Sequence, residues 1–251
     1  MLQEKPKICC LSNNMLKIIG AIAMVSDHMG VILFPDAEFL RLIGRLAFPI
    51  FAFLIAEGAK YTKNKLRHFL TVALFAAAIQ LVYSLYLGNT LEMNVMVTFT
   101  LSLLIIYALD AFKNVIFEYD SPLLKKIFCA LGVLGAVVIA IVADARLDLD
   151  YGLSGALVPV FPAICTTPKV KEPPEYFKWL DTPLLRVCVT SLGILALAID
   201  DGDIQYYSLF VIPILLLYSG ERGKYKMKYF FYIFYPLHLG VLWLISMLLS
   251  K

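Results

Sequence analysis

MLKIIGAIAMVSDHMGVILF, residues 15–34, is an apolar run of the length that an α-helix needs to cross a lipid bilayer. No small-residue cleavage site follows this run. It also contains Asp27 and His28, which the apolar core of a secretory signal normally excludes. We therefore expect the segment to be retained as a transmembrane helix.

The composition of the whole chain agrees with a membrane protein. Of its 251 residues, 61% are hydrophobic and only 16% are charged, whereas about a quarter of the residues in a soluble domain are charged. So much apolar surface cannot be buried in one soluble core, so we expect lipid to be the solvent. The five cysteines lack metal-ligand spacing and are interpreted as free thiols. No metal and no nucleic-acid partner are expected.

Further apolar runs continue along the chain. They predict an all-α, polytopic transmembrane helix bundle of about nine spans, forming one transmembrane domain over residues 1–251 without a soluble domain. Every span should be helical, because an open backbone in hydrocarbon would leave its amides unpaired. The spans are expected at residues 15–34, 39–59, 69–88, 91–110, 127–144, 151–166, 185–200, 205–218 and 229–250.

The charges in the predicted loops alternate in sign along the chain. Basic residues precede the first span and follow every second span, whereas the other loops are mainly acidic. The positive-inside rule therefore places the basic loops and the N-terminus in the cytoplasm. The basic residues are Lys5, Lys7, Lys60, Lys63, Lys65, Arg67, Lys113, Lys125, Lys126, Lys169, Lys171, Lys178, Arg186, Arg222, Lys224, Lys226 and Lys228.

Ionisable residues inside the predicted spans are costly in lipid and are therefore functional candidates. Asp27 and His28 lie in the first span, and Arg45 lies in the second. Counted from the outer ends of the two spans, His28 and Arg45 both lie about 9 Å deep. Since a short loop joins the spans, Asp27 and Arg45 should be level with each other, and pairing is the cheapest way to bury both.

The chemistry of this group leaves alternatives open. The Asp27–Arg45 pair can simply lock two helices, or it can form part of an active centre. His28 can act as a general base near neutral pH, or it can bridge helices by a hydrogen bond. His238, which follows Tyr235 and Pro236 near the middle of the last span, can make a polar contact near the site or a simple structural hydrogen bond.

Four other polar features are interpreted from their positions. Arg41 lies one turn from Arg45 and can extend toward the outer surface. Glu57 is expected to be a charge at a helix end near Lys60, and His68 is expected to be solvated or interfacial. Asp150 and Tyr151 are at the outer end of the sixth span. They either line an acceptor site or belong to an acidic external loop.

Several segments resemble the TraX family of bacterial membrane proteins, whose named member is the F-pilin acetylase. The first is Ser26-Asp27-His28-Met29-Gly30, and the most specific is GRLAFPIFAF, residues 44–53. Further matches are Asp150-Tyr151-Gly152 and FYIFYPLHL, residues 231–239. The resemblance extends from the first span to the last and therefore covers most of the chain.

The resemblance implies an acetyltransferase in the bacterial cytoplasmic membrane. The donor would be acetyl-CoA, and the acceptor would be a peptide amine, with glycan and lipid headgroup acceptors left open. His28 would be the catalytic base or acyl carrier, and Arg45 would orient Asp27 or stabilise an oxyanion. The phosphates of the cofactor could be held by basic residues on the cytoplasmic side, Lys60, Lys63, Arg222 and Lys224, although the positive-inside rule already explains these residues. The substrate site is assigned to Arg41, Asp150, Tyr151, Tyr235 and His238.

Two other functions compete with this one. A small proton-coupled transporter could use Asp27, Glu57 and the two membrane histidines as a relay, with helices broken at Pro49 and Pro236. The absence of an inverted repeat in the sequence argues against a transporter. The third possibility is a membrane scaffold in which the polar cluster is purely structural.

Overall fold

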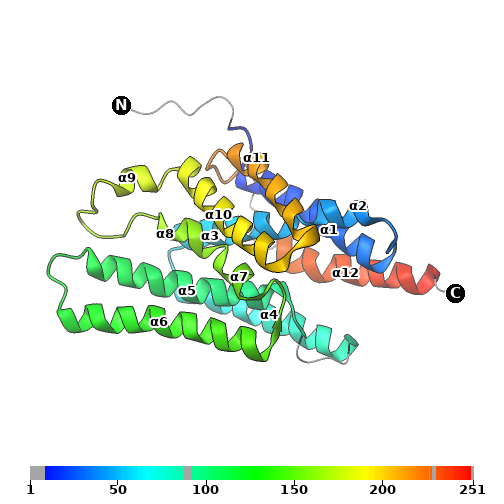
Figure 1. Cartoon of the computed structure of the whole chain (residues 1–251), viewed down its shortest axis with the longest axis horizontal. Coiled ribbons are helices and arrows are strands. Elements are labelled where there is room, and N and C mark those ends of the chain that lie inside the picture. Colours follow the sequence, from blue (N-terminus) through cyan, green and yellow to red (C-terminus); the bar gives the residue numbers. More distant parts are fainter. Residues whose placement is uncertain (1–8, 88–91, 226, 228–229, 250–251) are drawn as a thin grey trace. The chain divides into compact units, whose positions relative to one another are not determined.

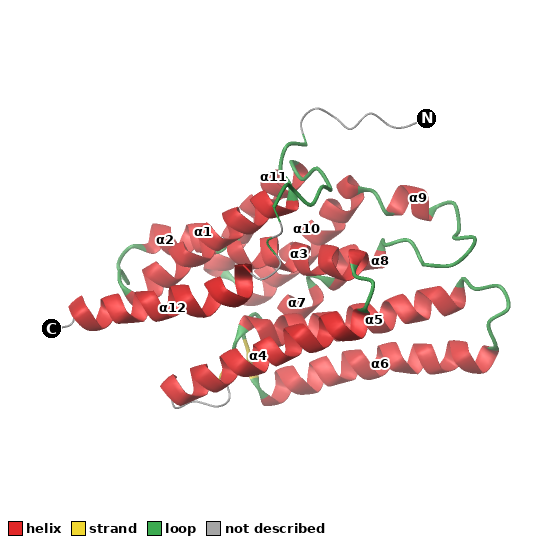
Figure 2. Cartoon of the chain, turned by 180° about the vertical axis from the view of Figure 1, so that it is seen from behind, coloured by secondary structure: helices red, strands yellow, loops and turns green. Residues whose placement is uncertain are grey.

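A computed structural model describes residues 9–87, 92–225, 227 and 230–249, and these residues are mostly helical (Figure 2). The two strands within them, β1 (Glu92–Met93) and β2 (Asp148–Leu149), pair in parallel and have two residues each. The helices are α1 (Asn13–Ile32), α2 (Glu38–Gly44), α3 (Ala47–Tyr61), α4 (Lys65–Leu87), α5 (Val95–Ile116), α6 (Leu123–Arg146), α7 (Gly152–Leu157), α8 (Val160–Ile164), α9 (Phe177–Leu180), α10 (Pro183–Asp201), η1 (Asp203–Phe210, a 3₁₀ helix), α11 (Val211–Leu216) and α12 (Phe230–Leu249).

Seven helices in the described part of the chain are long and apolar enough to cross a membrane. The prediction of an all-α, polytopic bundle is therefore confirmed, and the chain is a multi-pass membrane protein. The seven are Asn13–Ile32, Glu38–Tyr61, Lys65–Val82, Val95–Ile116, Leu123–Arg146, Pro183–Asp201 and Phe230–Leu249. The predicted spans 151–166 and 205–218 correspond to the shorter apolar helices Gly152–Ile164 and Asp203–Leu216.

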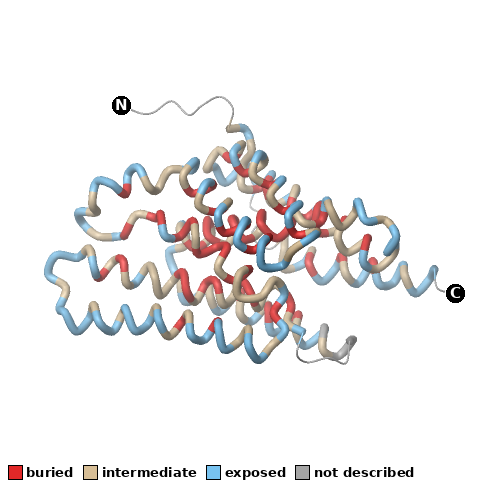
Figure 3. Tube along the Cα trace, in the orientation of Figure 1, coloured by how far each residue is buried: buried red, intermediate tan, exposed pale blue. Residues whose placement is uncertain are grey.

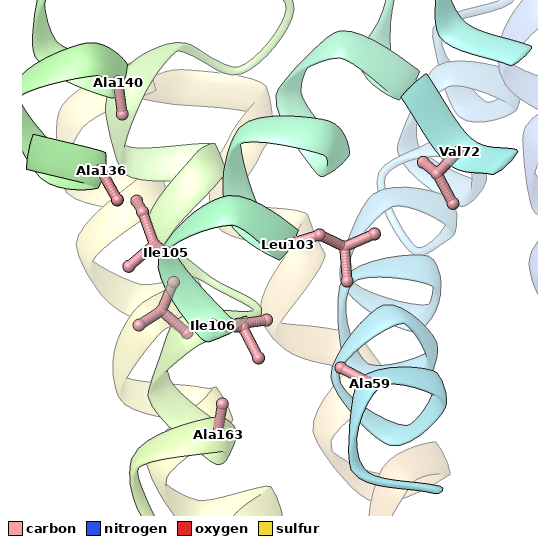
Figure 4. Close-up of a cluster of buried hydrophobic side chains, with 9 residues drawn as sticks. Ala59, Val72, Leu103, Ile105, Ile106, Ala136, Ala140 and Ala163 are labelled. Carbon is pink, nitrogen blue, oxygen red and sulfur yellow. The ribbon is translucent and has the colours of Figure 1, made fainter. Parts of the chain in front are cut away.

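The chain folds as two compact units, one formed by residues 1–54 and 201–251 and the other by residues 55–200. In the second unit, α5 and α6 lie side by side (Figure 1). Figure 4 shows Ile105 of α5 beside Ala136 and Ala140 of α6, and all three side chains are buried. Most of the α6 surface is exposed in Figure 3. Since its exposed side chains are mainly apolar, this surface suits contact with lipid.

The short segment α7–α8 runs parallel to α5 over most of its length. Thr98 near the start of α5 donates to the carbonyl of Asp150 at 2.7 Å, and Lys113 near its end donates to that of Thr166 at 2.9 Å. Between Thr98 and Lys113 an α-helix rises about 22 Å, which is most of the hydrocarbon thickness. These contacts give the predicted sixth span the depth of a crossing, although it is short and interrupted at Pro159.

In the first unit, α1 packs closely against α2 and the start of α3. A Cβ atom added to Gly44 would lie 2.3 Å from the Cβ of Asp27, and one added to Gly20 would lie 3.1 Å from the Ile50 side chain. α2 and α3 form one span that is interrupted at Arg45 and Leu46. Pro49 explains the interruption, because a proline ring clashes with the carbonyl four residues earlier, here that of Arg45.

Two basic residues that were counted with the loops are buried in helices. α5 extends beyond residue 110 to Ile116, so Lys113 is a buried helical residue rather than a loop residue. Arg186, which the predicted span 185–200 already contains, is buried within α10. Both cations remain inside because polar partners from other segments compensate their charge. Of the other predicted basic residues, Lys5, Lys7, Lys226 and Lys228 lie outside the described residues.

Candidate active site

The first polar group of the candidate site is an ion pair between the first two spans. Arg45 Nη2 donates to Asp27 Oδ1 at 2.6 Å, and both side chains are largely buried. The contact predicted from their equal depth is therefore present. Arg45 Nη1 also faces Oε1 of Gln205 in η1 at 3.4 Å. Because a guanidinium only donates, this contact identifies the amide oxygen of Gln205 as the atom that faces Arg45.

The second group is a pair of histidines from opposite ends of the chain. Nδ1 of His28 in α1 lies 3.0 Å from Nε2 of His238 in α12, and the two rings are tilted by 51°. Nδ1 of His238 lies 2.9 Å from the carbonyl oxygen of Phe234, one turn earlier. His238 is 7% exposed, whereas His28 is only partly buried. The accessible member of the pair is therefore His28.

Three further polar side chains of the first unit have buried polar atoms, and the sequence pointed only to Arg41. Gln205 and Ser208 lie one turn apart in the 3₁₀ helix η1, and both are 0% exposed. Within the described residues, Gln205 Nε2, Ser208 Oγ and Arg41 Nε are buried without a hydrogen-bond partner. Sequence reasoning missed Gln205 and Ser208, because a neutral polar residue in a short apolar run carries no strong signal. The only available hint was the amide of Gln205 inside a predicted span.

The residues assigned to the substrate site fall into both units. In the first unit, the side chain of Arg41 lies against Gly30 of α1, and the ring of Tyr235 lies 5.7 Å from that of His238. Asp150 and Tyr151 belong to the second unit. There the Asp150 carbonyl accepts from Thr98, and Tyr151 has a left-handed backbone with φ of 64° at the start of α7.

The residues assigned to cofactor phosphates also differ in their surroundings. Lys60 is ion-paired with Asp181 at 2.7 Å, whereas Lys63 is exposed, and both belong to the second unit. Arg222 and Lys224 of the first unit are exposed in the loop that follows α11. Backbone hydrogen bonds from Asn13 to Glu221 and from Ser219 to Leu11 fasten this loop to the start of α1.

Asp181 lies between α9 and α10, outside the helices long enough to span a membrane, and it pairs with Lys60 near the end of α3. Burial by itself raises the pKa of Asp181, but the hydrogen bonds from Lys60 and Thr167 outweigh burial and hold that pKa below its usual range. Thr167 donates to Asp181 Oδ2 through both its backbone N–H and its hydroxyl, each at 3.0 Å. Asp181 therefore ties the end of α3 to the segment that joins α8 to α10.

Two polar residues of the second unit have partners that the sequence did not predict. Glu57, expected as a charge at a helix end, is 2% exposed and forms an ion pair with Arg186 of α10. His68, expected to be solvated or interfacial, is half-buried, and its Nδ1 lies 2.5 Å from the hydroxyl of Tyr107. In both cases a partner more than 35 residues away compensates the polar group. No group of three metal-ligating side chains occurs among the described residues.

A comparison with known proteins identifies the family of this chain. A model of the family described as TraX protein matches residues 12–246, which include both histidines and the Asp27–Arg45 pair. The chain belongs to the TraX family. The TraX match therefore covers both compact units rather than the candidate site alone.

Two curated proteins are similar to this TraX family member. A probable fimbrial assembly protein, FimC of serogroup H1, from Dichelobacter nodosus is 26% identical over 90% of this chain and 92% of its own. An uncharacterized protein of Rickettsia prowazekii (strain Madrid E) is 29% identical over 55% of this chain and 50% of its own. No solved structure matches the chain.

Proposed function

We propose that this protein is a membrane-embedded acetyltransferase that moves an acetyl group from acetyl-CoA to an amine or hydroxyl. The observation that supports the proposal most directly is the grouping of His28, Asp27, Arg45 and His238 in one compact unit. Ionisable groups inside spans are costly and are retained mainly at functional sites. A partly accessible imidazole beside a fixed cation is the combination that acyl transfer requires.

Each residue has a distinct role in this proposal. His28 takes the proton from the attacking amine or hydroxyl. Asp27 holds Arg45 through the 2.6 Å ion pair, and Arg45 stabilises the negative charge that develops on the carbonyl oxygen of the acetyl group. Arg45 faces the amide oxygen of Gln205 in η1, and the buried donors Gln205 Nε2 and Ser208 Oγ of the same 3₁₀ helix can support the same charge. The acetyl carbon–sulfur bond of acetyl-CoA breaks as the bond to the acceptor forms, and the proton passes from His28 to the departing thiolate of CoA.

The donor and the acceptor are proposed from different observations. Arg222 and Lys224 are the stronger candidates for the CoA phosphates, because both are exposed and their loop is fastened to the start of α1. Lys60 is the weaker candidate, since Asp181 already engages its ammonium group. A peptide amine is the preferred acceptor, because the resemblance implies N-acetylation and one relative is named as a probable fimbrial assembly protein.

The experiment measures transfer of radiolabelled acetyl from acetyl-CoA by the purified protein in lipid nanodiscs, with hydrolysis in the absence of an acceptor measured alongside. We expect His28→Ala to lower the rate by about 100-fold or more, which is the contribution of a positioned general base. His68→Ala is the matched control, because His68 belongs to the second unit and contacts Tyr107. Full activity in His28→Ala, or no binding of acetyl-CoA by the wild type, would exclude the proposal.

The interrupted span at Arg45 and Leu46 keeps the transporter as a second candidate, because discontinuous helices are common in transporter sites. The same purified protein, reconstituted into proteoliposomes, can decide between the two functions. Proton-coupled solute uptake into proteoliposomes, without acetyl transfer, would favour the transporter.

A further inference from the structure

The two histidines of the candidate site offer four ring nitrogens, and their surroundings differ. One nitrogen faces a backbone carbonyl, two face each other, and the fourth, Nε2 of His28, makes no hydrogen bond within the described part of the chain. The positions of the protons in this chain follow from which atoms can only accept. These positions determine which nitrogen can react.

The carbonyl of Phe234 sets the first proton. A carbonyl oxygen can only accept, so Nδ1 of His238, 2.9 Å away, must carry a hydrogen. In a neutral imidazole the other nitrogen, Nε2, is then a lone-pair acceptor. A cationic His238 is disfavoured, because the ring is 7% exposed in a span and the carboxylate of Asp27 is already paired with Arg45.

The second proton follows from the first. Because Nε2 of His238 accepts, Nδ1 of His28 at 3.0 Å must donate. The contact with His238 therefore places the proton on Nδ1 of His28.

We infer that His28 reacts through Nε2, and that His238 is a positioning residue that holds His28 in the Nδ1–H tautomer. The inference rests on the proposed acyl transfer and specifies its reacting atom. His238 takes the place that a carboxylate holds behind the base in a catalytic triad, but it acts as a neutral acceptor. The proton of the acceptor moves to Nε2 as the new acyl bond forms, and then from Nε2 to the departing thiolate of CoA.

The tautomers can be observed without an activity assay. The chain has 3 histidines, so long-range ¹H–¹⁵N spectra of ¹⁵N-histidine-labelled protein in nanodiscs contain few signals. His68→Gln and His28→Gln assign them. At neutral pH we expect both His28 and His238 to be neutral and protonated on Nδ1. A His28 signal with the proton on Nε2, or a cationic His28, would overturn the inference.

Two substitutions of His238 test its positioning role in the reaction. His238→Gln keeps an oxygen that can accept from Nδ1 of His28, whereas His238→Leu removes every acceptor and fills a similar volume. We expect His238→Leu to lower acetyl transfer by about 100-fold and His238→Gln by no more than about threefold, since only the first releases the base. In the spectra, His28 should keep its tautomer in His238→Gln and lose it in His238→Leu. Equal loss of activity in both variants with an unchanged His28 tautomer would contradict the role.

The two readouts separate this inference from the proposed function. If the wild type transfers no acetyl group, the proposed function fails, and the spectra alone still decide the tautomer. If the wild type is active but His28 carries its proton on Nε2, the proposed function stands and the inference is wrong.

Discussion

The tightest contact in the candidate site leads to a specific prediction for Gly44. This glycine ends α2 next to Arg45, and its Cα faces Asp27 of α1. A methyl group at this position would lie 2.3 Å from the Asp27 Cβ, whereas ordinary contact begins at 3.4 Å. Gly44→Ala therefore has to move α1 and α2 apart by about 1.1 Å, because the contacting atoms include the backbone of Asp27.

The consequences for stability and activity follow from this displacement. If all of the displacement is transmitted to the ion pair, the distance from Arg45 Nη2 to Asp27 Oδ1 grows from 2.6 Å to about 3.7 Å, beyond hydrogen-bond reach. We expect the free energy of unfolding to fall by about 1–3 kcal/mol, as for other overpacked interiors. Acetyl transfer should fall by about 100-fold, because misplacement by about 1 Å can cost that much.

Gly135→Ala in α6 is the matched control, because no atom lies within 4 Å of its added methyl group. We expect it to raise the free energy of unfolding by about 0.5–1 kcal/mol, the usual gain of alanine over glycine in a helix. Both variants are compared with the wild type by equilibrium unfolding in mixed micelles and by the acetyl-transfer assay. If Gly44→Ala is as stable and as active as Gly135→Ala, the close packing of α1 on α2 does not hold the site together.

Three further predictions concern the buried charges. For the pair in the first unit, Asp27→Asn and Arg45→Gln should each lower the free energy of unfolding more than the double substitution does, with a coupling energy of about 1–3 kcal/mol. Additive losses in the double variant would mean that the two residues are not partners. For the pair in the second unit, Glu57→Gln or Arg186→Gln alone should cost about 3–5 kcal/mol, whereas Glu57→Leu with Arg186→Met should cost far less, because no uncompensated buried charge remains. Since the folded protein holds the pKa of Asp181 below its usual range, Asp181 contributes stability above the ordinary aspartate pKa, and this contribution is lost as pH falls through the depressed value. Unfolding midpoints measured against pH should show this loss in the wild type and a smaller one in Asp181→Asn; identical profiles would refute the assignment.

Most of the helical architecture was predictable from the sequence, because the cost of unpaired amides in lipid leaves helices as the only choice for long apolar runs. The same cost argument predicted that Asp27 and Arg45 would pair, since a short loop joins their spans and places them level. Boundaries were less predictable. Lys113 and Arg186 were counted with the basic loops, although the predicted span 185–200 contains Arg186. Both are buried in helices, because partners from other segments compensate their charge.

The apolar pattern thus identifies the segments that are apolar enough to enter the membrane, because the free energy of transfer into lipid depends mainly on the composition of each segment. The arrangement of the site is different, because each of its contacts joins separate segments. His28 and His238 are 210 residues apart, and Arg45 meets Gln205 across 160 residues. No local pattern encodes which face α12 turns toward α1. Packing of whole helices decides it, and only the folded chain brings the second histidine behind the first.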